Sequence, residues 1–384
     1  MAGYQGWFDA PDDGANRAWY HYGKSGKFEP GFSKVDMWPD MAEYAIQYPT
    51  AFKFEDGSTA TIFSSHDEST VRLHFKWMKE YGVDGVFMQR FVGEVKTASG
   101  KAHFNKVLNS AAEAALEYDR TISIMYDLSG MSSEDVDVVI SDWKDLMKQF
   151  GFDKRSKYSN YLFDNKRPVI AIWGVGFNDN RHYNLAEIEK LIRFFKSREA
   201  GNCCVMLGVP TFWREQGDDC VKDANFLEIL KMADIIQPWF VGRFNEQRYD
   251  AFKPLIGKDQ KWCDDHQLKY MPVVFPGFSW NNMYPNSKNG FIARNHGSFF
   301  WKQLTGAVHE GAEMIYVAMF DEIDEGTAIF KCAHRVPICI GSKFIPLDED
   351  IPSDHYLWLS GQAGQMLKDK RQLPFIKPTQ NVKK

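Results

Sequence analysis

Residues 314–326 combine a buried-strand pattern with a dense group of acids. The apolar run Met314-Ile-Tyr-Val-Ala-Met-Phe320 leads directly into Asp321, Glu322, Asp324 and Glu325. A continuous apolar run is typical of a strand that is buried on both faces of a parallel sheet. Four carboxyls at its end are electrostatically costly, because like charges at close range raise one another's pKa values. The segment therefore predicts a proton donor beside a base, with a solvated acidic turn or a cation site as alternatives.

Short apolar runs alternate with helical patterns along the whole chain. Two of the helical patterns have clear ends: residues 68–81 stop at Gly82, and residues 133–150 begin at Ser132-Ser-Glu-Asp135 and stop at Gly151. Eight runs are predicted to be strands: Tyr4–Phe8, Gly85–Phe91, Ile122–Leu128, Pro168–Gly176, Cys203–Pro210, Ile235–Val241, Met271–Phe275 and Met314–Phe320. Eight strand–helix units without a linker predict a single (β/α)8 TIM barrel over residues 1–384.

Residues at the carboxyl ends of barrel strands are expected to meet at one mouth. Long insertions at residues 9–66 and 327–352 are expected at the same face. Aromatic walls with a few hydrogen-bonding side chains and paired acids would make a sugar-binding cleft. The candidate substrate-binding residues are Trp7, Asp9, His21, Gln89, Arg90, Asp127, Trp173, Trp213, Arg214, Trp239, Arg243, Trp280, Asp321 and Asp324.

The arginines among these candidates leave two interpretations open. One interpretation is ordinary ion pairing at the barrel rim. The other, about equally well supported, is that these side chains bind an anionic substituent of the substrate, such as a uronate or a sulfate; the residues concerned are Arg90, Arg214 and Arg243. The histidines, individually, are better explained by hydrogen bonding or packing than by metal ligation.

Glu322 and Glu325 are the candidate catalytic pair. Two carboxylates three residues apart can face one cavity if the chain bends sharply after the first. Retaining glycosidases hold their two carboxyls roughly 5 Å apart and inverting enzymes about 6.5–9.5 Å apart, and the short spacing here favours the retaining class. The two residues would then act as general acid and nucleophile.

The sequence lacks the residues that other reactions of barrel enzymes need, namely metal-binding histidines, a Schiff-base lysine or a phosphate-binding loop. No histidine lies within a predicted strand, no predicted strand interior contains a lysine, and no glycine-rich phosphate loop is present. The six cysteines show no zinc-ligand spacing, so we expect neither a metal nor a cofactor. The net charge of −5, without a long basic run, argues against nucleic-acid binding, and no apolar stretch approaches the ~20 residues of a membrane span.

The N-terminal residues suggest where in or outside the cell the protein acts. Met1-Ala-Gly3 runs straight into the strand-like segment Tyr4–Phe8. A native chain rarely begins at a core strand, so we expect an export signal upstream and a secreted or periplasmic location. We also expect a monomer.

Two segments resemble a known family. Asp321-Glu-Ile-Asp-Glu-Gly326 resembles the catalytic strand of glycoside hydrolase family 99, the endo-α-mannosidases and mannanases, and of the related family 71. Near the other end of the chain, Tyr4-Gln-Gly-Trp-Phe8, Asp13-Gly14, Trp19, His21 and Trp38-Pro-Asp-Met-Ala-Glu-Tyr44 resemble that family's first strand and aromatic loop. The resemblance is clear at the ends and rests on the barrel pattern in the middle.

The resemblance implies roles for the two glutamates. Glu325 would be the general acid/base, and Glu322 would act as a base on the sugar's own 2-hydroxyl, giving a 1,2-anhydro intermediate and net retention. The family has Asn at the position of Asp321 and Trp-His at the positions of Ile323 and Asp324, so a preference for mannose does not follow.

The sequence thus predicts a retaining, endo-acting glycoside hydrolase of an α-linked polysaccharide or oligosaccharide, a mannan-like or related glycan. The alternatives are a carbohydrate-binding barrel without turnover and a hydrolase of an acidic or sulfated glycan. A polysaccharide lyase or a phosphate-handling barrel is a more distant third.

Overall fold

The centre of the molecule is a parallel sheet that closes on itself. The computed structural model describes residues 1–152, 160–288, 290–371 and 373–380. The strands follow the order β10-β9-β8-β7-β5-β4-β1-β14-β11, so each strand except β11 neighbours the one that comes before it in the chain. Their bounds are β1 (Ala2–Tyr4), β4 (Gly85–Phe91), β5 (Thr121–Asp127), β7 (Arg167–Trp173), β8 (Cys204–Val209), β9 (Ile235–Pro238), β10 (Lys269–Tyr270), β11 (Val273–Val274) and β14 (Tyr316–Val317).

The two ends of this sheet are halves of one segment. Strand β10 pairs in parallel with β9, and β11 pairs in parallel with β14. Only Met271 and Pro272 separate β10 from β11, and a proline has no N–H to donate to a sheet. The halves therefore act as a single seventh strand that joins β9 to β14 and closes the barrel. The predicted (β/α)8 fold is confirmed, although the seventh strand begins two residues before the predicted Met271 and is divided.

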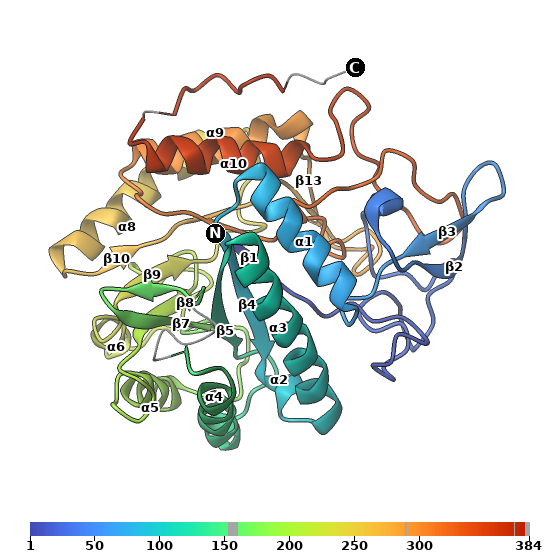
Figure 1. Cartoon of the computed structure of the whole chain (residues 1–384). Helices are drawn as coiled ribbons and strands as arrows, with labels where there is room; N and C mark the ends of the chain where they lie inside the picture. Colours follow the sequence, from blue (N-terminus) through green and yellow to red (C-terminus); the bar gives the residue numbers. More distant parts are fainter. Residues whose placement is uncertain (153–159, 289, 372, 381–384) are drawn as a thin grey trace.

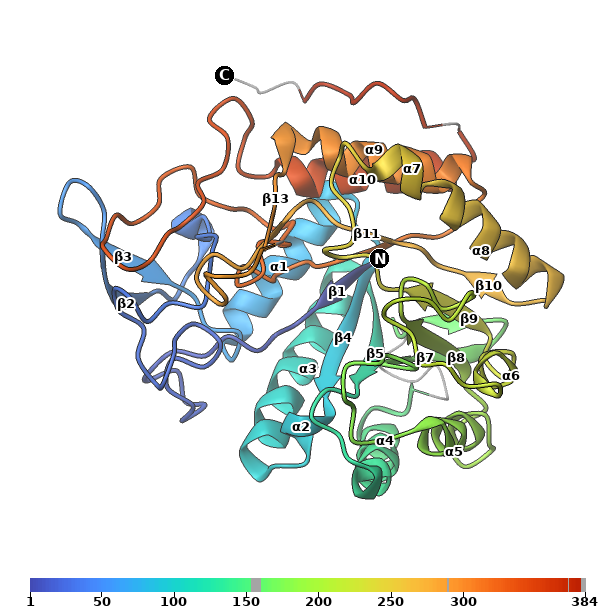
Figure 2. The same ribbon diagram turned by 180° about the vertical axis from the view of Figure 1, so that it is seen from behind.

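Helices surround the strands, as Figures 1 and 2 show. Helix α1 ends at Gly82 and α4 ends at Gly151, both in the left-handed conformation, as predicted. Ser132 and Asp135 form the predicted capping box ahead of α4. The barrel helices are α1 (Glu68–Tyr81), α3 (Ala98–Tyr118), α4 (Val136–Phe150), α5 (Leu185–Phe195), α6 (Phe226–Leu230), α7 (Tyr249–Phe252), α8 (Pro254–Asp265), α9 (Ser298–His309) and α10 (His355–Lys368).

The predicted insertions carry small elements of their own. Residues 9–66 contain the antiparallel hairpin of β2 (Tyr48–Lys53) and β3 (Thr59–Ile62), which projects to one side of the barrel in Figure 1. The remaining short elements are α2 (Val92–Val95), β6 (Phe163–Asp164), β12 (Phe278–Ser279), β13 (Phe291–Ile292) and the 3-10 turns η1 (Met41–Glu43), η2 (Ser133–Asp135) and η4 (Asn295–Gly297).

The two long insertions are joined to each other and to the loop after strand seven. Met37 forms a bridge with Ile345, and Pro39 forms one with Cys332. The buried Asp36 carboxylate accepts hydrogen bonds from the backbone amides of Asn281 (2.6 Å) and Asn282 (2.8 Å). These contacts give the C-terminal face of the barrel a fixed wall. Within the described residues, no helix is long and apolar enough to cross a membrane.

Candidate active site

A cleft of about 650 Å³ opens at the carboxyl ends of the strands. Glu322 and Glu325 line it together with four tryptophans, which come from different strand ends. These are Trp7, Trp173, Trp239 and Trp280, and each is partly buried. The structure thus brings the predicted catalytic pair and the predicted aromatic walls into one cavity.

Glu322 is a buried carboxylate with a fixed orientation. It is 4% exposed, its Oε1 accepts a hydrogen bond from the side-chain amide of Gln5, and its Oε2 accepts one from the Thr327 hydroxyl at 2.5 Å. Burial and the neighbouring charges of Glu325 and Asp324 raise the pKa of Glu322 well above its usual range. The two hydrogen bonds act in the opposite direction, because both donors stabilise the ionised form.

Glu325 lies three residues on and is less enclosed than Glu322. Burial, followed by the negative charge of Asp324, raises the pKa of Glu325 to about 7, and the Trp280 indole beside it counteracts part of that shift. Because the two glutamates also influence each other, they titrate as a pair. A pair of this kind holds a proton near neutral pH, which supplies an acid and a base in one cavity.

The two aspartates of the acidic segment lie outside the cleft, which corrects their assignment as substrate-binding residues. Asp321 is fully buried and accepts hydrogen bonds from the backbone amides of Gln5 (2.8 Å) and Gly6 (2.9 Å). It therefore joins the last strand to the chain after β1. Asp324 is also fully buried, and its Oδ2 lies 3.5 Å from Nδ1 of His21. Burial raises the pKa of each aspartate to about 7.

Ring stacking fixes the tryptophans. Trp7 stacks on His21, with ring centroids 3.7 Å apart and planes at 7°, and Phe91 packs on it with a centroid distance of 4.8 Å. Trp173 meets Trp239 edge to face at 5.3 Å. Aromatic rings held in this way need little further ordering when they contact a ligand, so less conformational entropy is lost on binding.

Four further predicted residues line the cleft: His21, Gln89, Asp127 and Arg243. Gln89 donates to the Tyr316 hydroxyl at 3.1 Å, while its own carbonyl oxygen has no hydrogen-bond partner. Burial raises the pKa of Asp127 above its usual range. Arg243 forms an ion pair with Asp219 at 2.8 Å. These side chains supply hydrogen-bonding groups around the glutamate pair.

The remaining predicted residues point away from the cleft, which is a correction to the sequence analysis. Arg90 is 1% exposed and forms a buried ion pair with Asp142, with Nη2 2.6 Å from Oδ1. Trp213 is fully buried and donates to Asp259 at 3.1 Å, and Nε of Arg214 lies 3.0 Å from the same carboxylate.

Asp9 is the last of these corrections, because it is fully buried beside His103 and Arg17. Successive residues of a strand point to opposite faces, so a list of strand-end residues mixes those that face the mouth with those that pack against helices.

Comparison with known proteins places the chain in a family. The family model described as "Domain of unknown function (DUF5010)" matches residues 107–338, a span that includes both Glu322 and Glu325. The chain belongs to this family. No curated protein matches it in sequence.

Solved structures resemble the fold over nearly its full length. The structure of the GH99 endo-alpha-mannosidase from Bacteroides thetaiotaomicron has a TM-score of 0.71 at 15% identity and covers 96% of this chain and 97% of its own. The same enzyme in complex with BIS-TRIS-Propane has a TM-score of 0.70 at 15% identity, with the same coverage of both chains. A glycoside hydrolase-like protein has a TM-score of 0.57 at 12% identity and covers 87% of this chain and 96% of its own. The resemblance to family 99 seen in the sequence therefore holds for the fold.

The cleft also contains residues that the sequence analysis did not name. Gln5 follows β1 directly, and the predicted first strand, Tyr4–Phe8, placed it inside a strand instead of at the mouth. Glu94 belongs to the short helix α2 after β4, where no motif marks it. The other additional lining residues are Phe91, Gly93, Ser129, Gly130, Phe177, Asp179 and Met319.

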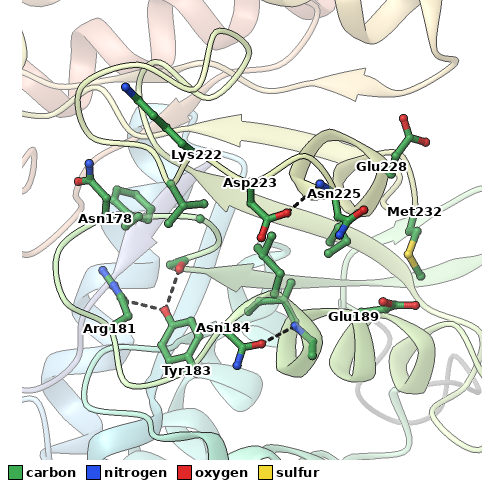
Figure 3. A pocket seen from close by; sticks show the side chains of 18 of the residues that line it. Asn178, Arg181, Tyr183, Asn184, Glu189, Lys222, Asp223, Asn225, Glu228 and Met232 are labelled. Carbon is green, nitrogen blue, oxygen red and sulfur yellow. Dashed lines mark hydrogen bonds between the residues drawn. The ribbon is translucent and has the colours of Figure 1, made fainter.

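A second, larger hollow of about 880 Å³ adjoins the cleft between the loop after β7 and the segment around α6. Figure 3 shows its polar lining, which includes Arg181, Lys222 and Asp223. It contains no buried acid pair, so we assign the chemistry to the smaller cleft. Phe177 lines both cavities, so the larger hollow lies next to the cleft with this ring between them.

Proposed function

We propose that the protein is a retaining glycoside hydrolase that cleaves within an α-linked, neutral polysaccharide or oligosaccharide. The observation that carries the proposal is the glutamate pair, Glu322 and Glu325, which is buried in a cleft between four tryptophans. Two carboxyls of raised pKa at a sugar-sized cavity fit acid-assisted cleavage of a glycosidic bond.

We assign the roles of the two glutamates from their accessibility and from the resemblance to family 99, because burial raises the pKa of both. Glu325 has a pKa of about 7 and is the more accessible of the two, which suits a general acid that protonates the leaving oxygen and later deprotonates water. Glu322 is oriented by Gln5 and Thr327 and acts as its basic partner. It either attacks the anomeric carbon or takes the proton of the sugar's 2-hydroxyl. The likeness of the fold to an endo-α-mannosidase supports the second route and a mannan-like substrate.

The charge of the cleft favours a neutral glycan over an acidic or sulfated one. Five carboxyl groups line it, from Glu94, Asp127, Asp179, Glu322 and Glu325. Glu94 pairs with Arg17 and Asp179 pairs with Arg181, which leaves the carboxyls of Asp127, Glu322 and Glu325 to set the charge of the cleft. Among the described lining residues, Arg243 is the one arginine or lysine, and Asp219 already pairs with it. A uronate or sulfate group would be repelled by this arrangement.

The adjoining hollow supports cleavage within a chain. The second hollow meets the cleft at Phe177, so it offers space nearby for sugar units on one side of the cleaved bond. An exo-acting enzyme would instead need a closed end next to its catalytic residues.

A product screen tests the proposal. Wild type and Glu325→Gln are incubated with α-mannans, α-glucans and sulfated or uronate-containing polysaccharides, and the products are read by mass spectrometry. We expect oligosaccharides from a neutral α-glycan with wild type alone. Equal product formation by Glu325→Gln would refute the assignment of the acid, and cleavage confined to anionic glycans would refute the substrate class. The exposed Glu349→Gln variant serves as the control.

A carbohydrate-binding barrel without turnover is the second candidate. The differences from family 99 at Asp321, Ile323 and Asp324 favour it. Calorimetric binding of an oligosaccharide without any product in chromatography would identify this function.

A further inference from the structure

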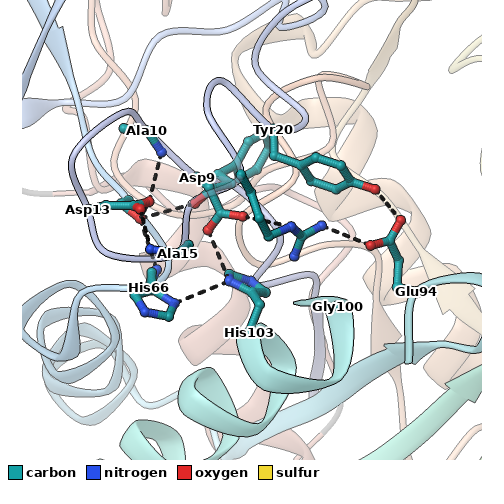
Figure 4. A network of polar contacts seen from close by, with 12 residues as sticks. Asp9, Ala10, Asp13, Ala15, Tyr20, His66, Glu94, Gly100 and His103 are labelled. Carbon is teal, nitrogen blue, oxygen red and sulfur yellow. Dashed lines mark hydrogen bonds and ion pairs between the residues drawn. The ribbon is translucent and has the colours of Figure 1, made fainter. Parts of the chain in front are cut away.

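A cluster of Asp9, His66 and His103 lies behind the wall of the cleft (Figure 4). Asp9 follows β1, His66 immediately precedes the N-cap residue of α1, and His103 belongs to α3, so three separate segments meet here. None of the three residues lines the cleft. The inference therefore does not depend on the proposed function.

The three side chains direct one ligand atom each to a common point. Asp9 Oδ1 lies 3.0 Å from His103 Nδ1, and His103 Nδ1 lies 3.4 Å from His66 Nδ1. All three atoms lie within 4.8 Å of one another. In a tetrahedral zinc site with bonds of about 2.1 Å, ligand atoms are roughly 3.4 Å apart. The cluster is close to that spacing.

The other ring nitrogen of His103 defines its tautomer. Nε2 lies 2.7 Å from the backbone carbonyl oxygen of Gly6, and a carbonyl can only accept, so Nε2 carries a proton. In a neutral imidazole, Nδ1 of His103 then carries a lone pair, which faces the Asp9 carboxylate and the ring of His66. The contact between Nδ1 of His103 and the Asp9 oxygen is favourable only if a cation, or a second proton on His103, lies between the two atoms. A metal-binding histidine commonly has this arrangement, with its other N–H on a backbone carbonyl.

The surroundings of Asp9 also leave one of its oxygens free to bind a metal ion. It is 0% exposed, and neither of its oxygens has a hydrogen-bond partner among the described residues. Nε of Arg17 lies 3.3 Å from Oδ2, while Nη2 of Arg17 lies 2.8 Å from Glu94, so Arg17 holds one oxygen and leaves Oδ1 directed at the histidines. Arg17 compensates the charge of Asp9 only in part, because it also pairs with Glu94, and Oδ1 faces the histidines without a hydrogen-bond donor.

We propose that Asp9 Oδ1, His66 Nδ1 and His103 Nδ1 bind a divalent first-row transition ion, for which Zn²⁺ is the probe. Two imidazoles and one carboxylate suit such an ion better than Mg²⁺ or Ca²⁺, which prefer oxygen ligands alone. His66 is partly exposed and provides the route of entry.

The ion would have a positioning role. It would join the segment after β1 to α1 and α3, and Trp7 lies two residues before Asp9 in that segment. Trp7 stacks on His21 in the cleft wall, so the bound ion would fix one aromatic wall without touching the substrate. No motif in the sequence marks this site, because its ligands are 57 and 37 residues apart in the chain.

Calorimetry with Zn²⁺ on chelator-treated full-length protein tests the site, with the metal content of the purified protein measured by mass spectrometry. We expect one equivalent to bind to wild type and His66→Ala to weaken binding at least tenfold. His182→Ala, which removes an exposed histidine outside the cluster, should bind like wild type. Zn²⁺ should raise the melting temperature of wild type and of His182→Ala but not that of His66→Ala.

Two results would overturn the proposal. One is the absence of Zn²⁺ binding to wild type, which would make His103 an imidazolium that pairs with Asp9. The other is unchanged binding in His66→Ala, which would place the ion elsewhere. His66 is the residue to change first, because it is the least buried of the three and its loss leaves the Asp9–His103 contact intact.

Discussion

The side-chain amide of Gln5 donates a hydrogen bond to Oε1 of Glu322, 317 residues further along the chain. Gln5 follows the first barrel strand and Glu322 follows the last, and β1 and β14 pair directly where the barrel closes. The closure of the barrel therefore positions one carboxylate of the proposed catalytic pair. Thr327 holds the other oxygen of the same carboxylate.

Loss of the Gln5 amide is expected to change the pH dependence of activity. The amide stabilises the ionised form of Glu322, so Gln5→Met, which preserves volume, should raise the pKa of that carboxyl further. We expect the acidic limb of the pH–rate profile to move to higher pH by about 1 unit, because a hydrogen bond to a charged group contributes on the order of 1.5 kcal/mol. Gln365→Met, at an exposed position of α10, should leave the profile unchanged. An unshifted acidic limb in Gln5→Met would contradict the role of Glu322 as the base.

The tryptophan walls should contribute to substrate binding. Trp173→Ala removes a ring that lines the cleft and contacts Trp239, so we expect KM to rise about tenfold, which corresponds to ~1.4 kcal/mol. Steady-state kinetics on the glycan identified in the product screen measure this change.

Trp213→Phe provides the matched comparison, because Trp213 is buried outside the cleft and donates to Asp259. It should lower the melting temperature and leave KM unchanged. The prediction fails if both variants change KM equally.

Arg90 is expected to act on stability and not on catalysis. Arg90→Met leaves the buried Asp142 without its guanidinium, so we expect the free energy of unfolding to fall by about 3–5 kcal/mol. Denaturant unfolding measures this loss. Adding Asp142→Leu removes the uncompensated charge and should restore part of the stability. If Arg90→Met instead raised KM in a fully folded protein, Arg90 would be a substrate-binding residue after all.

The raised pKa of Glu325 makes stability depend on pH. Its pKa is about 7 in the folded protein and about 4.3 in an unfolded chain, so the folded state binds more protons between these values. Stability should therefore fall as pH rises from about 4.5 to 7 and stop changing through this group above that range. Glu325→Gln should flatten this slope and raise the melting temperature at pH 7 by a few degrees, as scanning calorimetry would show. An equal slope in both proteins would indicate that Glu325 is not protonated in the folded state.

The local patterns of the sequence were sufficient to predict the fold class and to single out two glutamates that line the cleft. The alternation of apolar runs and helical segments required a barrel, and the caps at Gly82 and Gly151 lie where they were predicted. Glu322 and Glu325 are separated by one turn of chain after a buried run, so their proximity did not depend on distant residues. Both features arise from periodicity and short-range contacts, which a single sequence contains.

The assignment of the other site residues required the tertiary structure. Gln89 and Arg90 are neighbours on β4, yet Gln89 faces the cleft and Arg90 packs against Asp142 behind the sheet. Asp321 and Glu322, in the irregular segment after β14, also diverge: Asp321 accepts from the backbone after β1 and Glu322 faces the cavity. The pleat makes adjacent residues point to opposite sides, and only the register of each strand against its neighbours decides which side is the mouth.

The sequence by itself therefore determined the barrel, the acid pair and the aromatic character of the cleft, because each depends on residues close together in the chain. The tertiary structure decided which polar groups face the substrate, which of them pair behind the walls, and which distant residues meet. Gln5 with Glu322, and Asp9 with His66 and His103, come together only because the barrel closes and the helices pack around it. Contacts of such long range leave no periodic trace in a sequence, so they appear only once the chain is folded.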